Sequence, residues 1–96
     1  YMLTLDSYAF QFSDAYFRRA NVTLLEDKRI TLNNQSCHRF VAVMDDGHGE
    51  EEFKTMVYIW VRNNWAYNLT FTAKPDKYEE LKPTAQKVVE SFKFAK

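Results

Sequence analysis

The segment from Phe53 to Arg62 is apolar on both sides of an extended chain, and this pattern restricts the possible folds. Successive side chains of a β-strand point to opposite faces of the sheet. One face would carry Phe53, Thr55, Val57, Ile59 and Val61, and the other would carry Met56, Tyr58 and Trp60. Such a strand must be covered on both faces, or must meet a ligand on one of them. We therefore expect it to be the central strand of a sheet.

A tight turn and a second alternating segment follow this strand. Asn63 and Asn64 tolerate the positive φ angles of a two-residue turn, so the chain is expected to reverse between Arg62 and Trp65. The residues after the turn alternate as far as Ala73. One side would be apolar, with Trp65, Tyr67, Leu69, Phe71 and Ala73. The other side is mainly polar, which is the pattern of a strand with one buried and one solvated face.

Shorter strand signals precede the central strand. Residues 29–32 and 37–44 are expected to be strands around a turn at Asn33-Asn34-Gln35. Residues 22–25 are expected to form a separate extended piece, because the charged residues 26–28 interrupt the apolar pattern. The first half of the chain therefore adds two or three strands to the sheet.

Helical spacing occurs at both ends of the chain. Apolar residues recur at intervals of three and four over about residues 5–19, which predicts an amphipathic helix with Thr4 as its N-cap. Near the other end, Asp76 and Glu79 have the spacing of a capping box, so a helical turn is expected over 77–81.

The residues after this turn predict a second helix. Pro83 disfavours a helix interior, so the helix is expected to begin there and to run to about Ser91. Phe92-Lys93-Phe94 is a candidate for a short final strand. Together these patterns predict an α+β fold in the order α-β-β-β-β-α-(β), with an antiparallel sheet of four to five strands and a helix at each end. The 96 residues allow one domain, 1–96.

Charge and composition exclude several classes of protein. Thirteen Lys and Arg balance thirteen Asp and Glu. This argues against a nucleic-acid partner, which requires a basic surplus. The single cysteine, Cys37, excludes an internal disulfide and a Cys-rich zinc site. No apolar run reaches the ~18–20 residues of a membrane span, so no transmembrane segment is expected.

The segment from Asp45 to Glu52 holds five of the thirteen acidic residues and both glycines. It is expected to be a loop between two strands. A divalent cation prefers several convergent oxygen ligands, so Asp45, Asp46, His48 and Glu50 are candidate metal ligands. The spacing is not that of an EF-hand, and a solvated acidic loop is the favoured interpretation.

Two further groups of residues carry possible chemistry. Cys37 and His38 are neighbours in a strand and would face opposite ways, so they cannot form a thiolate–imidazole dyad. No other catalytic motif is present, and we expect a non-enzymatic protein without a cofactor. Met56, Tyr58 and Trp60 are candidate partner-binding residues, because they could form an apolar platform for a protein or a small apolar ligand. A covering helix is the favoured alternative for them.

The chain resembles the PsbP-like superfamily, which includes PsbP, the DcrB-type bacterial lipoproteins and Ran-binding import factors. The similarity is carried by three segments, Ile30–Phe40, Trp65–Ala73 and the terminal Val88–Phe94. Asn34 replaces the glycine that the family usually has in its turn, and the strands usual before the first helix are missing. We therefore expect a shortened member of the family or a fragment of a longer protein.

The resemblance implies a binding, assembly or chaperone role without common catalytic residues. Our first hypothesis is a binding or assembly module of a bacterial envelope protein, with any membrane tether outside this chain. The alternative is a cytoplasmic chaperone or adaptor that shields apolar helices of a partner. A cation-binding or enzymatic domain that uses the acidic loop is the third hypothesis.

Overall fold

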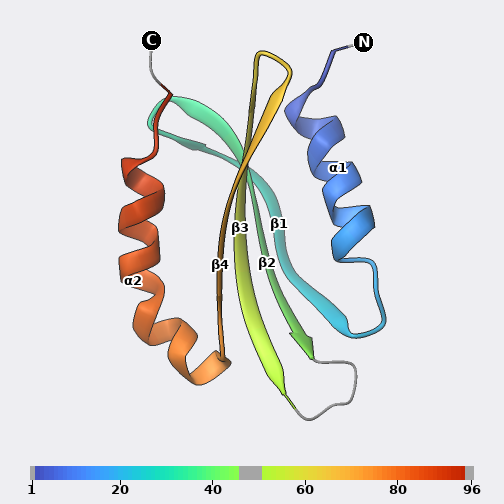
Figure 1. Ribbon diagram of the computed structural model, residues 1–96, viewed down its shortest axis with the longest axis vertical. Helices are drawn as coiled ribbons and strands as arrows, with labels where there is room; N and C mark the ends of the chain where they lie inside the picture. The colour runs from blue at the N-terminus through green and yellow to red at the C-terminus, as the bar shows by residue number, and fades with distance from the viewer. Residues whose placement is uncertain (1, 46–50, 95–96) are drawn as a thin grey trace.

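A computed structural model describes residues 2–45 and 51–94 (Figure 1). The elements follow one another as α1 (Leu5–Tyr16), β1 (Val22–Leu32), β2 (Gln35–Asp45), β3 (Glu52–Arg62), β4 (Trp65–Ala73) and α2 (Pro75–Ser91). The strands form one antiparallel sheet in the order β1-β2-β3-β4, so each strand pairs with its neighbours in sequence. The predicted α+β class and the order of its helices and four strands are confirmed.

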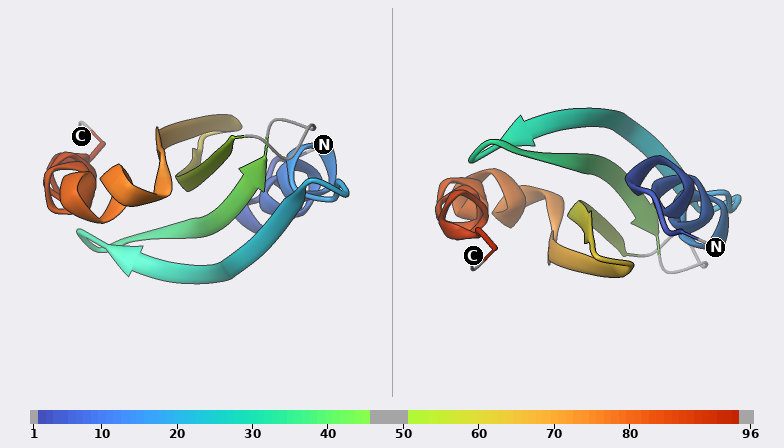
Figure 2. Two further views of the ribbon diagram at one scale, coloured as in Figure 1. Left: turned by 90° about the horizontal axis from the view of Figure 1, so that it is seen from below. Right: turned by 90° about the horizontal axis from the view of Figure 1, so that it is seen from above.

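The two helices cover opposite faces of this sheet, as the views along its long axis show (Figure 2). Under α1 the buried residues are Leu5, Ala9, Phe17, Phe40, Ala42, Val57 and Ile59. Under α2 they are Cys37, Val41, Met56, Tyr58, Trp60, Tyr78 and Val89. The central strand β3 thus contributes alternate residues to two separate cores. This confirms that its apolar pattern on both faces reflects packing on both sides.

Two Asn-Asn turns connect the strands at one end of the sheet. Asn33 and Asn34 have φ angles of 52° and 62°, and Asn63 and Asn64 have angles of 53° and 64°. Positive φ at both central residues is the geometry of a type I′ hairpin, which matches the twist of the flanking strands. The second turn is as predicted. The first is one residue shorter than predicted, because Gln35 already pairs with Leu32.

The first helix begins as predicted but ends earlier. The side chain of Thr4 accepts a hydrogen bond from the backbone N–H of Ser7, and Ser7 completes the capping box. The helix ends at Tyr16 rather than near residue 19. Phe17 leaves the helical register and turns into the core, where it is buried and its ring lies 5.1 Å from that of Phe40. Burial of this ring outweighs continuation of an exposed helix.

The predicted interruption of the first strand is wrong. Val22–Leu32 is one continuous strand, and a bulge between Leu24 and Glu26 absorbs the irregularity. The charged residues are tolerated because β1 is an edge strand and its charges find partners on the neighbouring strand. The guanidinium of Arg39, on β2, donates through Nε to Glu26 Oε1 at 2.6 Å.

The structure of residues 75–94 differs from the prediction. The helix α2 is continuous through Pro83 and begins at Pro75, and its N-cap Lys74 makes no side-chain capping bond. The predicted Asp76 cap and the break before Pro83 are therefore wrong. Tyr78 and Val89 anchor the helix in one core on both sides of the proline, and Figure 1 shows a bend in its first half. Phe92 caps the helix, and residues 92–94 do not form a strand.

Candidate binding surface

The predicted platform of Met56, Tyr58 and Trp60 lies beneath α2. Their exposed fractions are 2, 3 and 1%. The Trp60 ring packs against that of Phe92, with 4.2 Å between ring centroids and the ring planes tilted by 37°. The prediction that these residues form an open apolar platform is therefore wrong, and the alternative, that a helix covers them, is correct. They are core residues and not surface residues.

The predicted acidic site falls mainly outside the described residues. Asp46, His48 and Glu50 belong to the segment 46–50, which the structure does not describe. Asp45 is the last residue of β2, and its carbonyl oxygen accepts a hydrogen bond from the amide of Asn21 at 3.0 Å. Within residues 2–45 and 51–94, no group of three or more potential metal ligands converges. The cation site therefore stays a prediction.

Cys37 and His38 lie on opposite faces of β2, as predicted. Cys37 is fully buried under α2. Burial raises the pKa of its thiol to about 11, although the Arg39 charge lowers it in part. His38 lies on the other face, where its Nε2 pairs with Asp27 and its ring lies 4.6 Å from that of Phe40. A dyad between the two is excluded by this geometry.

An exposed aromatic surface lies at the β3–β4 hairpin, on the side of the sheet that α2 covers. We call it the hairpin patch and define it by Arg62, Trp65, Tyr67 and Phe94. Trp65 is 70% exposed and Tyr67 is 39% exposed. Arg62 and Trp65 are direct partners in the strand ladder. The guanidinium carbon of Arg62 lies 5.0 Å from the centroid of the Phe94 ring, and the Phe94 and Tyr67 rings meet edge-on at 5.0 Å.

The segment after α2 completes this patch by folding back over the sheet. The backbone N–H of Phe94 donates to the side-chain oxygen of Gln35 at 3.2 Å. The side-chain amide of Asn33 donates to the carbonyl oxygens of Glu90 and Phe92, at 2.6 and 3.0 Å. The left-handed turn that connects β1 to β2 thus caps the carboxyl end of α2. It also fixes the direction in which the last aromatic residues leave the helix.

The second Asn-Asn turn holds the other helix. The side-chain oxygen of Asn64 accepts a hydrogen bond from the backbone N–H of Leu3 at 2.8 Å. Leu3 immediately precedes the Thr4 cap of α1. Each hairpin turn therefore positions one helix end, and the two helix ends lie at the same end of the sheet (Figure 1). This arrangement is what brings the two ends of the described chain close to the hairpin patch.

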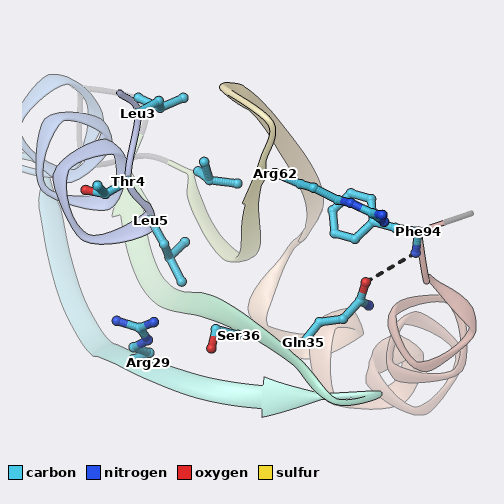
Figure 3. A pocket seen from close by; sticks show the side chains of 9 residues that line it. Leu3, Thr4, Leu5, Arg29, Gln35, Ser36, Arg62 and Phe94 are labelled. Carbon is cyan, nitrogen blue, oxygen red and sulfur yellow. Dashed lines mark hydrogen bonds between the residues drawn. The ribbon is translucent and has the colours of Figure 1, made fainter. Parts of the chain in front are cut away.

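A hollow of about 520 Å³ opens beside the patch (Figure 3). Its walls come from the start of α1, the β1–β2 hairpin, the end of β3 and Phe94. Arg29 lines one side and is held by Asp6 through two contacts of 3.1 Å. Gln35 lines another side, and its buried Nε2 has no hydrogen-bond partner among the described residues. The hollow gives the aromatic patch a polar border.

Sequence patterns did not identify this patch. They place Trp65 and Tyr67 on the apolar side of β4, where burial is the normal outcome. In the structure, burial along that side falls from intermediate at Leu69, Phe71 and Ala73 to exposed at Tyr67 and Trp65. The alternation indicates which side a residue takes. It does not indicate how far a helix extends along the strand.

The chain matches no known protein-family model, and no curated protein matches it. A solved structure has a similar fold. It is the crystal structure of PA94 from Pseudomonas aeruginosa, a protein of unknown function whose description suggests a regulator. The TM-score is 0.77 at 12% sequence identity, and the match covers 95% of this chain and 62% of PA94. The chain thus spans about three fifths of the length of that protein, and the similarity supports the fold alone.

Proposed function

We propose that this domain is a non-catalytic binding module that holds an apolar segment of a partner protein against the hairpin patch. The observation that carries the proposal is the 70% exposure of Trp65 beside a half-exposed Tyr67 and Arg62. Trp, Tyr and Arg are the residues most enriched at the energetic centres of protein interfaces. A large exposed ring is well suited to insert into a partner here, because the backbone that carries it is already ordered by the β3–β4 ladder.

The surroundings of the patch support the same assignment. Asn63, Asn64 and the polar side of the neighbouring hollow form a hydrophilic border around the rings. Interfaces commonly combine an apolar centre with a polar rim. The buried Trp60 and the partly buried Phe92 lie behind the patch, and the Phe92 ring contacts both Trp60 at 4.2 Å and Tyr67 at 6.4 Å. An assembly role at the bacterial envelope, which the PsbP-like resemblance implies, fits such a surface.

A second candidate function is a chaperone or adaptor that shields an apolar helix of its partner. It is favoured by the apolar side chains that are exposed on other elements. Met2 is 76% exposed, Phe10 63%, Leu25 55% and Val88 52%. A surface that covers a long apolar helix needs contacts spread over several elements.

None of the helices in the described part of the chain is long and apolar enough to cross a membrane.

The test is site-specific photocrosslinking in the native cell. A photoreactive residue at Asn63 lies next to the patch, and one at the exposed Gln11 on α1 is the control position. We expect Asn63 to crosslink to a discrete protein and Gln11 not to do so. The Trp65→Ala substitution should remove this crosslink without lowering the melting temperature. The matched substitution Phe10→Ala also removes an exposed ring. It should leave the crosslink intact if the hairpin patch alone holds the partner, and weaken it if the surface of the second candidate, which includes Phe10, takes part.

The identity of the crosslinked segment separates the two candidate functions. A segment from an envelope protein supports the assembly module, and an apolar helix of a soluble or exported protein supports the chaperone. Equal crosslinking in the parent and the Trp65→Ala variant would contradict both, since it would show that the patch does not contribute to capture.

A further inference from the structure

The two outer edges of the sheet differ in how they are protected. β1 and β4 are the edge strands, and the helices lie on the faces rather than beyond these edges (Figure 2). An edge strand presents a row of unpaired backbone N–H and C=O groups that can accept another strand. Natural proteins commonly protect such an edge with charges, bulges or prolines. The distribution of these features over β1 and β4 therefore indicates which edge can accept another strand.

The β1 edge carries these protective features. Glu26, Asp27, Lys28 and Arg29 follow one another along it, and the bulge after Leu24 distorts its ladder. The β4 edge carries none of them. Its nine residues, Trp65–Ala73, include no charged residue, no glycine and no proline, and its pairing with β3 is regular throughout. β4 is thus a regularly paired, uncharged edge, and no other strand of the described residues pairs with its outer side.

We propose that β4 pairs in antiparallel register with β4 of a second copy of this chain, about a two-fold axis at Leu69. The two four-stranded sheets then become one continuous sheet. The pairs on the α2 side are Leu69 with Leu69, Tyr67 with Phe71, and Trp65 with Ala73 of the second copy. The pairs on the other side are Asn68 with Thr70 and Ala66 with Thr72.

This register is self-complementary in both charge and shape. No like charges meet, because the strand has none between residues 65 and 73. Aromatic pairs such as Tyr67 with Phe71 and polar pairs such as Asn68 with Thr70 are favourable directly opposite one another in antiparallel sheets. A shift by one residue would place apolar residues opposite the polar side of the partner strand. The alternation of β4 therefore excludes such shifts, and the register centred at Leu69 is the one that pairs all nine residues of Trp65–Ala73.

The pairing is tested by charge at Thr70, an exposed residue of β4. In the proposed register, Thr70 of one copy is the diagonal neighbour of Thr70 in the other, at roughly 7–8 Å. Sedimentation should give the purified parent chain twice its mass of 11.4 kDa. Thr70→Lys or Thr70→Glu alone should weaken the dimer by up to about fivefold, because like charges at neighbouring cross-strand positions are destabilising. An equimolar mixture of the two variants should restore a dimer that contains one copy of each.

The control is Thr31→Lys, which places the same charge at an exposed position on the opposite edge, β1. It should leave the dimer unchanged. A parent chain that stays monomeric over the concentration range, or a dimer that Thr31→Lys disrupts while Thr70→Lys does not, overturns the proposal. Circular dichroism confirms that each variant is folded. The two tests remain distinguishable although Trp65 and Tyr67 take part in both surfaces. Sedimentation of the purified chain measures self-association, whereas the crosslink in the cell identifies a different protein or a second copy.

Discussion

The two tryptophans of this chain provide a direct test of how its surface and core are divided. Trp60 is 1% exposed and packs against Phe92, whereas Trp65, five residues later, is 70% exposed. Replacing a buried Trp by Ala removes its transfer free energy and leaves a cavity, at a cost of ~3–5 kcal/mol. Replacing an exposed residue away from special backbone geometry changes stability by about 0.5 kcal/mol or less.

These magnitudes are large relative to the stability of the whole domain. A chain of this length is expected to have a free energy of unfolding of roughly 5–14 kcal/mol. Trp60→Ala should therefore remove at least about a fifth of it, and most of it if the domain is at the low end of this range. The melting temperature should fall by at least about 12 °C, given about 4–8 °C for each kcal/mol in a domain of this size. Trp65→Ala should melt within about 4 °C of the parent.

The assay is urea unfolding followed by far-ultraviolet circular dichroism, because tryptophan fluorescence changes with the substitutions themselves. A third variant, Trp60→Phe, refines the test. The indole Nε1 of Trp60 is buried without a hydrogen-bond partner among the described residues, and an orphaned donor costs ~1–3 kcal/mol. Trp60→Phe removes that cost and should destabilise far less than Trp60→Ala. Equal losses for Trp60→Ala and Trp65→Ala would refute the placement of α2 over Trp60.

Three further predictions concern the turn, the thiol and the helix proline. Asn33→Gly keeps the positive φ but removes the two hydrogen bonds to the end of α2. It should therefore lower the free energy of unfolding, measured in urea, by about 1 kcal/mol. The control substitution Asn34→Gly should be close to neutral. Because burial raises the pKa of Cys37 from its ordinary 9.0 to about 11, the unfolded thiol ionises first. The free energy of unfolding should therefore fall by an additional ~2 kcal/mol between pH 9 and 11 in the parent relative to Cys37→Ala. Pro83→Ala should raise the melting temperature, because proline is ~3 kcal/mol less favourable than alanine inside a helix. Proline also restricts the unfolded chain, but this stabilises the folded protein by at most about 1 kcal/mol. A lower melting temperature would mean that the bend in α2 is required for packing.

Local sequence patterns predicted the sheet well because a strand has a fixed two-residue period. The assignment of β3 residues to two faces follows from that period alone, and both faces proved to be buried. The Asn-Asn turns were predictable for a similar reason, since few residues tolerate two successive positive φ angles. The acidic candidate site stays a prediction, because Asp46, His48 and Glu50 lie outside the described residues.

The errors arose where long-range packing outweighs local preference. Pro83 disfavours a helix interior, yet burial of Tyr78 and Val89 in one core keeps α2 continuous through it. The charged residues of β1 disfavour a buried strand, yet an edge position and the partner Arg39 accommodate Glu26. In both cases the deciding contacts come from residues far away in the chain, which a local pattern does not contain.

Periodicity and backbone sterics are local properties, so the class of fold, the approximate turn positions and the two faces of the central strand can be derived from the amino-acid sequence. Which apolar residues meet water depends on the tertiary structure. Met56, Tyr58 and Trp60 are covered because α2 packs over them, and Trp65 is exposed because that helix ends before reaching the hairpin. Burial depends on which elements lie opposite one another in space. The candidate binding surface therefore lies at the hairpin end of the sheet and not at its centre, where the sequence pattern had placed it.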